Sequence, residues 1–329
     1  MGARLAVIGS NSFSGASFIS YALGQGHEIL AISRSPENSK YLLPYKWGNY
    51  EKLKFNQLDL NKHTLEIIEA IKEFDAQYVV NFAAQAMVAE SWDNPVHWYQ
   101  TNVLANVRLH DQLRKFDSLC KYLHVSTPEV YGSCSGLVQE DHPFSPSTPY
   151  ATSRASCDMH LINFHENYDF PVVFTRAANV YGPGQQLYRI IPRTILFIKT
   201  GRKLQLHGGG KSLRSFIHIS DVARATLEIL TKASSPEAYH LSTNQHISIH
   251  NLVELICERM STDFEKLVQV SPDRPGKDGA YLLDSSKAND EFGWEPKVSL
   301  EEGIEKTISW VDNNFDDLSK EAMEYQHKE

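Results

Sequence analysis

The sequence lacks an excess of positive charge, long apolar segments and paired cysteines, and each absence excludes a class of protein. Its formal net charge is -8 at pH 7, so it offers no basic surface for nucleic acid. No apolar run approaches the ~20 residues of a membrane-spanning helix, so no membrane partner is expected. The cysteines show no disulfide-framework or metal-binding spacing, which predicts free thiols in a reducing cytoplasm: Cys120, Cys134, Cys157 and Cys257.

The histidines do not indicate a metal site either. None of the 14 forms a His-x-x-x-His pair beside a carboxylate ligand, so no metal is predicted. With 42% hydrophobic and 22% charged residues, the composition is that of an ordinary globular protein. At 329 residues the chain exceeds the usual single core of about 250 to 300 residues, which predicts two lobes.

The N-terminus contains a strand, a turn of small residues and a helix. Leu5–Ile8 is a short apolar run typical of a buried parallel strand, and an amphipathic pattern continues to about Leu23. Between them, Gly9 to Gly15 follows the spacing G-x-x-G-x-x-G, with a serine at the middle position. Such a turn directs backbone N–H groups at a pyrophosphate, whereas the alternative is a plain strand-to-helix loop. The predicted cofactor-binding residues here are Gly9, Ser12, Phe13 and Gly15.

The second predicted strand bears on the choice of dinucleotide. It spans Glu28–Ile32 and ends at Ser33 and Arg34, without the acidic residue that commonly binds the adenosine ribose of NAD. An arginine can pair with a 2′-phosphate, so NAD(P) is the predicted cofactor and NADP is favoured. The alternative is a solvated Arg34. Asp59 and Leu60, after a strand near residues 55–58, could lie near the adenine or merely cap a helix.

Two more strands come next in the chain. Tyr78–Asn81 continues into small residues, including Ala83, that would let the backbone run close under the cofactor. A loop at Gln85 and a long helix near 94–116 precede the fifth strand, 122–126. Five strands alternating with helices predict an α/β fold with a doubly wound parallel (Rossmann) sheet.

Tyr150 and Arg154 form a candidate proton-transfer pair. Residues four apart lie on one face of a helix, so both side chains can address one point in a cleft. A free tyrosine titrates near ~10 and is a poor base at neutral pH unless a fixed positive charge stabilises its phenolate. Arg154 could supply that charge.

Several ordered motifs carry a family resemblance. They are S-T-P-E-V-Y-G from Ser126, the P-Y-x-x-x-cation segment at Tyr150, R-A-A-N-V-Y-G-P-G-Q from Arg176, R-S-F-I-H-I-S-D-V-A from Arg214, and D-R-P-G from Asp273. Together the motifs resemble the extended short-chain dehydrogenase/reductases, and most of all the nucleotide-sugar 4,6-dehydratases.

The resemblance implies roles for individual residues. Tyr150 would take the proton from the sugar 4-hydroxyl while hydride passes to the nicotinamide, with Thr127 hydrogen-bonded to the same oxygen. Glu129 would remove the C5 proton, which a ketone at C4 acidifies. Arg154 takes the place of a lysine that holds the cofactor ribose. The substrate, a UDP-, dTDP-, GDP- or CDP-linked sugar, would be contacted by Gln85, Thr127, Pro128, Glu129, Asn179, Arg214 and Arg274.

Two departures from the family pattern limit the chemistry. Arg154 cannot give up a proton as a lysine can. Pro128 stands where the dehydratases carry the aspartic acid that protonates the departing C6 hydroxyl, and losing such an acid commonly costs about 10² to 10⁴ in rate. The sequence therefore predicts an atypical 4,6-dehydratase, or a reductase/5-epimerase acting on a 5,6-unsaturated sugar nucleotide. The alternatives are a nucleotide-sugar 4-epimerase and a binding protein whose catalysis has lapsed.

The same resemblance predicts the organisation of the chain. Residues 1–178 with 214–245 would form the dinucleotide-binding domain, and residues 179–213 with 246–329 a smaller α/β C-terminal substrate-binding lobe. The strands near 216–219 and 239–241 would return to the large lobe. The highly charged segment from Phe315 is predicted to fray. Relatives pair through their two long helices, here near 94–116 and 150–168, so a homodimer is expected.

Overall fold

The computed structural model describes residues 2–48, 51–134, 136–272 and 282–328. Its centre is a seven-stranded parallel sheet in the order β12-β7-β5-β4-β1-β2-β3. The order reverses beside β1, which creates the crevice in which open α/β sheets bind ligands. The predicted doubly wound fold is confirmed. The strands are β1 (Arg4–Ile8), β2 (Glu28–Ser33), β3 (Leu53–Gln57), β4 (Tyr78–Asn81), β5 (Lys121–Val125), β7 (Val172–Ala177) and β12 (Ala238–Leu241).

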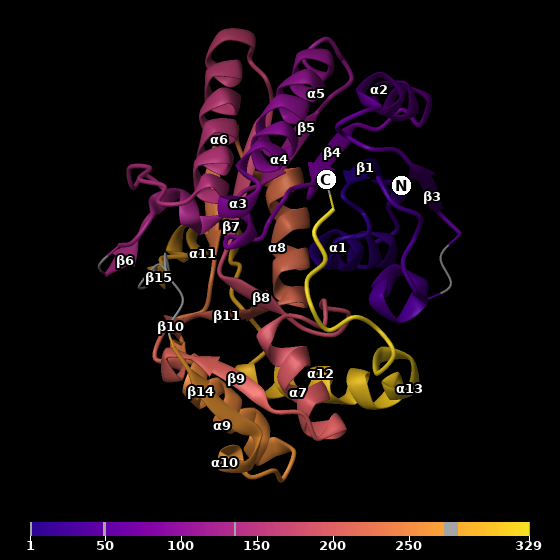
Figure 1. The fold of residues 1–329 in the computed structure, drawn as a ribbon. Helices are drawn as coiled ribbons and strands as arrows, with labels where there is room; N and C mark the ends of the chain where they lie inside the picture. The colour runs from indigo at the N-terminus through magenta and orange to yellow at the C-terminus, as the bar shows by residue number, and fades with distance from the viewer. Residues whose placement is uncertain (1, 49–50, 135, 273–281, 329) are drawn as a thin grey trace.

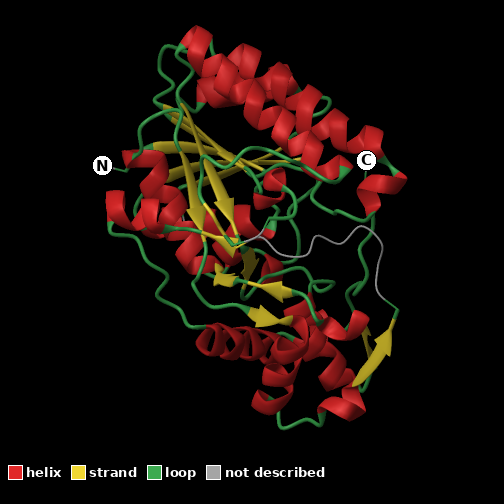
Figure 2. Ribbon diagram, turned by 90° about the vertical axis from the view of Figure 1, so that its left-hand side faces the viewer, coloured by secondary structure: helices red, strands yellow, loops and turns green. Residues whose placement is uncertain are grey.

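Helices cover both faces of the sheet (Figures 1 and 2). In β1, Leu5 and Val7 belong to the apolar cluster that includes α1 (Phe13–Gly24) and α8 (Ile219–Lys232). The alternate residues Ala6 and Ile8 belong to the cluster on the other face, with α2 (Thr64–Glu73), α5 (Asn106–Leu113) and α6 (Pro149–Tyr168). Successive side chains of a strand point to opposite faces, so a strand covered on both sides is apolar throughout.

The long helix predicted near 94–116 is not regular. It consists of α4 (Pro95–Tyr99), a π-helical segment at Gln100–Ala105, and α5. The Asn106 amide donates to the Thr101 carbonyl (2.9 Å) and the Asn102 carbonyl (3.2 Å), bonds that help to satisfy the widened turn. Such π-helical turns are frequent at functional sites.

The smaller lobe, in the lower part of Figure 2, has its own apolar cluster. It is formed chiefly by α7 (Ile190–Thr200), α9 (Ile249–Arg259) and α12 (Leu300–Asn313). Of the two strands predicted to return to the large lobe, β12 joins the large sheet. The other, β11 (Phe216–His218), pairs with β8 (Asn179–Tyr181) in a separate two-stranded sheet, but its Ile217 belongs to the apolar cluster of the large lobe. The domain boundaries given above remain predictions.

Shorter elements are α3 (Glu90–Asp93), β6 (Leu137–Val138), β9 (Leu204–His207), β10 (Leu213–Arg214), β13 (Ile247–Ser248), α10 (Phe264–Leu267), β14 (Val268–Ser271), β15 (Leu282–Leu283), α11 (Ser286–Phe292) and α13 (Phe315–Leu318).

The C-terminal segment differs from the prediction that it frays. After α13 it runs in extended form up to the large lobe (Figure 1), where Lys328 contacts Gln85 in the loop after β4. Burial alternates along it: Met323 is buried and Tyr325 and His327 are half-buried, whereas the residues between them are exposed. This alternation is typical of an extended segment packed on one side. Within the described ranges, no helix has the length and apolar character needed to cross a bilayer.

Candidate active site

The turn after β1 has the close backbone packing that a dinucleotide site needs. Gly9 has φ +85°, and a Cβ there would lie 2.6 Å from the Ala83 nitrogen. A Cβ on Gly15 would lie 2.4 Å from the Gly9 carbonyl oxygen. Only glycine fits either place, and the turn leads into the N-terminus of α1, where a pyrophosphate can bind. The residues present therefore fit NAD(P).

The Ser12 hydroxyl is bonded within the turn itself. Its Oγ donates to the Gly9 carbonyl (2.7 Å) and accepts from the Gly15 N–H (3.1 Å), which caps α1. The side chain thus holds the turn together. The Ser12 backbone N–H also donates to the Gly9 carbonyl at 3.0 Å, so both of its donors are used within the turn.

A cavity of about 260 Å³ lies over this turn at the carboxyl ends of β1, β2 and β4. It brings together most of the predicted cofactor residues: Gly9, Ser12, Ser33, Arg34, Asp59, Leu60 and Ala83. Four predicted cofactor residues do not line it: Phe13 packs in the core, Gly15 lies behind the turn, and Tyr150 and Arg154 lie on α6. Gln85, predicted to touch substrate, lines this cavity instead. Asp59 also caps its own turn, because Oδ1 accepts from the Asn61 N–H at 2.8 Å.

The candidate catalytic residues come from the segment after β5 and the start of α6. Thr127 caps a short 3-10 helix, Pro128–Tyr131, and its hydroxyl accepts from the Glu129 N–H at 3.3 Å. Pro128 is the first residue of that helix, where no N–H is needed, and it is buried. Tyr150 is the second residue of α6, after the cap Thr148, whose hydroxyl accepts from the Ala151 N–H at 3.1 Å. Tyr150 is hydrogen-bonded with Thr127 and lies close enough to Glu129 to feel its charge, so the three residues lie together.

The protein groups around Tyr150 do not make it a strong base. Its side chain is 8% exposed. Burial raises the pKa of Tyr150 and the Glu129 carboxylate raises it further, while Arg154 and a hydrogen bond with Thr127 lower it. Arg154 thus acts in the predicted direction, but burial and Glu129 outweigh it.

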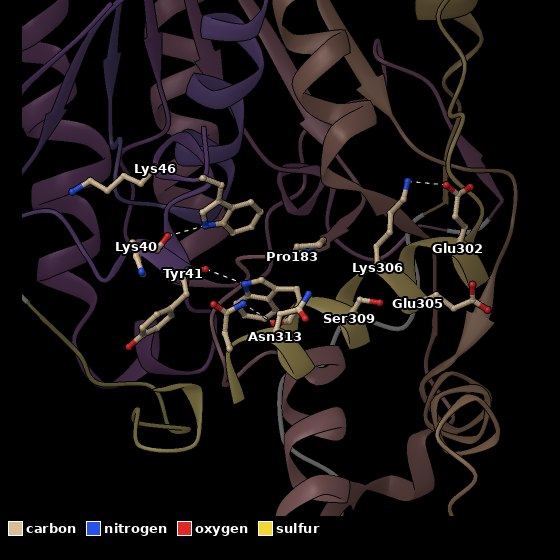
Figure 3. A pocket seen from close by; sticks show the side chains of 12 residues that line it. Lys40, Tyr41, Lys46, Pro183, Glu302, Glu305, Lys306, Ser309 and Asn313 are labelled. Atoms are coloured by element: carbon tan, nitrogen blue, oxygen red, sulfur yellow. Dashed lines mark hydrogen bonds and ion pairs between the residues drawn. The ribbon is translucent and has the colours of Figure 1, made fainter. Parts of the chain in front are cut away.

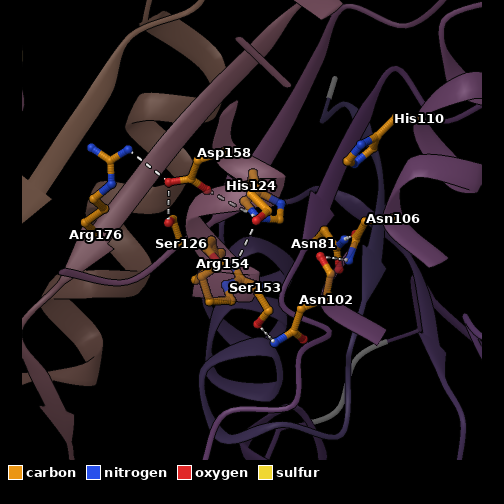
Figure 4. A network of polar contacts seen from close by, with 12 residues as sticks. Asn81, Asn102, Asn106, His110, His124, Ser126, Ser153, Arg154, Asp158 and Arg176 are labelled. Atoms are coloured by element: carbon orange, nitrogen blue, oxygen red, sulfur yellow. Dashed lines mark hydrogen bonds and ion pairs between the residues drawn. The ribbon is translucent and has the colours of Figure 1, made fainter. Parts of the chain in front are cut away.

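Arg154 does not face the cleft. It is 1% exposed, and its terminal nitrogen donates to His124 Nε2 at 3.0 Å and to the Val125 carbonyl (Figure 4). Burial and the charge of Arg154 hold the pKa of His124 well below its usual value, so the ring is neutral. Because Nε2 accepts, the ring proton is on Nδ1. The predicted contact with ribose hydroxyls would require the arginine to turn out of this position.

A buried carboxylate balances the charge beside Arg154. Asp158, 0% exposed and one turn further along α6, accepts from Arg176 at 2.9 Å and from the Ser126 hydroxyl at 2.6 Å. Its other oxygen lies 3.7 Å from His124 Nε2. Figure 4 shows this carboxylate between the arginine of β7 and the end of β5. The cluster therefore fixes the segment that carries Thr127 to the helix that carries Tyr150.

A second hydrogen-bond network, centred on Asn102, connects α6 to the loop after β4 that lines the cofactor cavity. The Asn102 amide donates to Ser153 Oγ (2.9 Å) and to the Gln85 carbonyl (3.0 Å), and its oxygen accepts from the Gln85 N–H (2.8 Å). Ser153 in turn donates to the Tyr150 carbonyl at 2.7 Å. These bonds couple the position of the catalytic helix to the loop after β4.

The predicted substrate residues outside the catalytic segment are less clearly placed. Asn179 donates to the Ser215 carbonyl at 3.2 Å, a structural bond between β8 and the segment before β11. Arg214 lies in β10, and one of its nitrogens donates to the Leu213 carbonyl at 2.8 Å. Arg274 lies outside the described residues.

Several residues of the site escaped the sequence prediction. Asn11 donates to the carbonyls of Ser35 (3.0 Å) and Pro36 (2.8 Å), which ties the glycine turn to the segment after β2. His124 and Asp158 lie next to predicted residues, but their burial together is visible only in three dimensions. Lys328 lines the cofactor cavity from the far end of the chain.

A more open cavity, of about 740 Å³, lies between the β2–β3 connection and α12 (Figure 3). Trp310 donates from its indole to the Tyr41 carbonyl at 3.0 Å, which fastens the two sides together. None of the predicted site residues lines this larger cavity. In the described part of the chain, no cluster of three or more histidine, cysteine, aspartate or glutamate side chains could hold a metal ion.

Comparison with known proteins points to one group of enzymes. A sequence model of the family GDP-mannose 4,6 dehydratase matches residues 7–307. The chain is 37% identical over 280 residues to dTDP-D-glucose 4,6-dehydratase of Mus musculus, covering 82% of this chain and 76% of that protein. A Streptomyces venezuelae dTDP-glucose 4,6-dehydratase crystallised with NAD has a TM-score of 0.88 at 27% identity, covering 94% of this chain and 97% of that one. A Thermotoga maritima UDP-glucose 4-epimerase with UDP-glucose has a TM-score of 0.86 at 25% identity, covering 95% and 99%.

Proposed function

Because the chain belongs to the GDP-mannose 4,6 dehydratase family within the extended short-chain dehydrogenase/reductases, which also include nucleotide-sugar epimerases, we propose that it modifies a nucleotide sugar through a transient C4 ketone. Bound NAD(P) would accept the C4 hydride and later return it. Tyr150 takes the proton of the 4-hydroxyl, and Thr127 hydrogen-bonds the same oxygen. The observation that carries this proposal is the grouping of Thr127, Glu129 and Tyr150, with Glu129 close enough to raise the pKa of the tyrosine.

Glu129 then acts on the carbon next to the ketone. A carbonyl at C4 acidifies the C5 hydrogen, so a carboxylate at this place can remove it as a general base. The carboxylate also keeps a negative charge beside Tyr150, which favours the phenol after it has taken the proton. Tyr150 on α6 therefore handles the proton at the C4 oxygen, and Glu129 on the segment after β5 handles the proton at C5. The buried cluster around Asp158 holds these two elements together.

Pro128 limits the chemistry available at C6. The departing C6 hydroxyl of a 4,6-dehydration needs an acid, and proline offers neither a side-chain proton nor a backbone N–H. We therefore propose that the chain acts as an atypical dehydratase, or on a sugar that has already lost this hydroxyl. In the second case, oxidation at C4 of a 5,6-unsaturated sugar gives an enone, the hydride adds at C6, and Glu129 in its protonated form gives a proton to C5. The product is a 4-keto-6-deoxy sugar, and the cofactor ends in its starting redox state.

The experiment is incubation with UDP-, dTDP-, GDP- and CDP-linked sugars, saturated and 5,6-unsaturated, in deuterated water, followed by mass spectrometry. Deuterium at C5 of a 4-keto-6-deoxy or C5-epimerised product supports the proposal. A C4 epimer without label would identify a 4-epimerase, and no change with any sugar would identify a lapsed binding protein. Rapid release of water from an intact 6-hydroxy sugar would contradict the role given to Pro128. Glu129→Gln is the matched variant, since it keeps the shape and should abolish the label.

The choice of dinucleotide and the oligomeric state are further parts of the proposal. We propose that Arg34 lets the chain use NADP, although the similar Streptomyces venezuelae structure holds NAD. We also propose a cytoplasmic homodimer that pairs through α5 and α6. Leu104, next to α5, is 49% exposed and suits such an interface, whereas Leu113 is part of the core.

A further inference from the structure

The segment Tyr325–Lys328, here called the strap, crosses the cofactor cleft. The Lys328 carbonyl accepts from the Gln85 side-chain amide at 2.6 Å and from the Arg34 guanidinium at 3.3 Å. Arg34 follows β2 and Gln85 lies just beyond β4, and these two strands flank β1. The Lys328 carbonyl oxygen is bonded from the β2 side and from the β4 side, so it lies over the turn that follows β1. Lys328 is accordingly among the residues that line the 260 Å³ cavity.

Ring contacts fix the strap to both lobes. The His327 ring lies nearly parallel to those of His97 and Trp98 in α4, with centroids 5.1 and 5.2 Å away, and its Nε2 is 2.8 Å from His97 Nδ1. Tyr325 packs edge-on against Tyr188, which precedes α7 in the smaller lobe, at 5.5 Å. The strap thus contacts α4 in the large lobe and the segment before α7 in the smaller lobe.

The segment before the strap is fastened independently. The Met323 side chain belongs to the core of the smaller lobe, and Glu324 forms an ion pair with Arg193 at 2.8 Å. The Tyr41 hydroxyl donates to the Glu321 carboxylate. These contacts bring the chain to the cleft and would persist if the strap were absent.

We propose that the strap retains the bound dinucleotide. A dinucleotide in this fold extends from the β2 side of the glycine turn, which holds the adenosine, to the β4 side, which holds the nicotinamide. A molecule in that place lies between the turn and the strap. It can leave only after the strap has given up its bonds with Arg34 and Gln85.

Retention suits the reaction proposed above, on which this inference rests. There the dinucleotide is reduced and reoxidised within one turnover, so it need not exchange. A segment held by a few side-chain contacts opens more readily than the sheet and still slows escape.

The test is the release rate of NADH and NADPH from the full chain and from a variant lacking Tyr325–Glu329, which keeps Met323 and Glu324. Displacement by excess oxidised dinucleotide in a stopped-flow fluorimeter gives the rate. Release should accelerate by about tenfold or more, because two hydrogen bonds and the ring contacts that oppose opening are lost. His327→Ala should give a smaller increase. Lys328→Ala, which keeps the carbonyl, should stay within about twofold of the full chain.

Three outcomes separate the possibilities, with circular dichroism and thermal unfolding used to show that each variant is folded. Equal release rates for the full chain and the deletion variant overturn the strap and leave the proposed function intact. Slower release and tighter binding by the deletion variant also overturn it, since the strap would then compete with the dinucleotide. If the full chain binds neither dinucleotide, the proposed function fails together with the strap.

Discussion

The inner and outer walls of the cofactor cleft differ in what holds them. The inner wall consists of the ends of β1, β2, β4 and β5 and the start of α6, and it is backed by buried polar groups such as Asp158 and Arg176. The outer wall is the strap, held by ring contacts and by one backbone carbonyl. Chemistry needs fixed positions, whereas access needs a part that can open. The comparison implies that substitutions in the inner wall should affect catalysis or stability, and changes in the outer wall should affect exchange.

The substitution Tyr150→Phe should have the largest effect, and it tests whether the inner wall affects catalysis without affecting dinucleotide exchange. The change removes the phenolic oxygen that takes the 4-hydroxyl proton, and general acid–base groups commonly contribute about 10² to 10⁴ in rate. Turnover of a nucleotide sugar should fall by that amount, measured as kcat by product analysis. The strap does not depend on the phenol, so the dinucleotide release rate should stay within about twofold of that of the unchanged chain. Unaltered turnover would refute the role given to Tyr150.

The next largest effect is expected from Asp158→Ala. Removing one partner of a buried ion pair leaves the other charge uncompensated and typically costs about 3–5 kcal/mol. Arg176, which is 2% exposed, would be that stranded charge. Urea unfolding should show the loss as a lower midpoint. The matched control is Glu305→Ala, which breaks the exposed pair with Arg259 and should cost no more than about 1 kcal/mol. Equal effects of the two substitutions would show that the cluster does not stabilise the inner wall.

The two walls also differ in how far the sequence predicts them. The inner wall follows local rules: Leu5–Ile8 reads as a buried strand, the glycines require a tight turn, and Tyr150 follows a capped helix start. Arg154 could not be placed in this way. Its type suggested a contact with the cofactor, yet its side chain turns to His124, a pairing that depends on how β5 packs against α6.

The outer wall is harder to predict, because the high charge of this segment conceals its periodicity. Phe315 onwards is rich in charged residues, but Met323, Tyr325 and His327 alternate with polar residues, which is the pattern of a segment packed on one side. That pattern could have indicated an ordered segment. Its target could not have been found, because Lys328 and Gln85 are 243 residues apart.

Acid should weaken the buried polar groups behind the inner wall, among them His240 of β12. His240 Nε2 lies 2.8 Å from the Tyr131 hydroxyl, and burial, helped by the charge of Arg176, lowers the pKa of His240 to about 3. The unfolded ring titrates near ~6.5, so between these values the unfolded chain binds more protons and stability falls as the pH falls. From pH 6.5 to pH 4 the loss from this residue should be about 3 kcal/mol. His240→Asn should lower stability at neutral pH but flatten the dependence in this range, as measured by urea unfolding at each pH. An unchanged slope would contradict the buried neutral ring.

The smallest predicted effect lies where the two walls meet. Arg34 lines the inner cavity and donates to the strap, and the proposal that the chain uses NADP depends on it. Arg34→Ala should weaken NADP binding by about 1.5–3 kcal/mol more than NAD binding, because a charge-assisted bond to the 2′-phosphate is lost. Isothermal titration with both dinucleotides measures the difference, and Arg34→Lys, which keeps the charge, should restore part of it. An equal loss for NAD and NADP would assign Arg34 to holding the strap, since that contact is the same whichever dinucleotide lies beneath it.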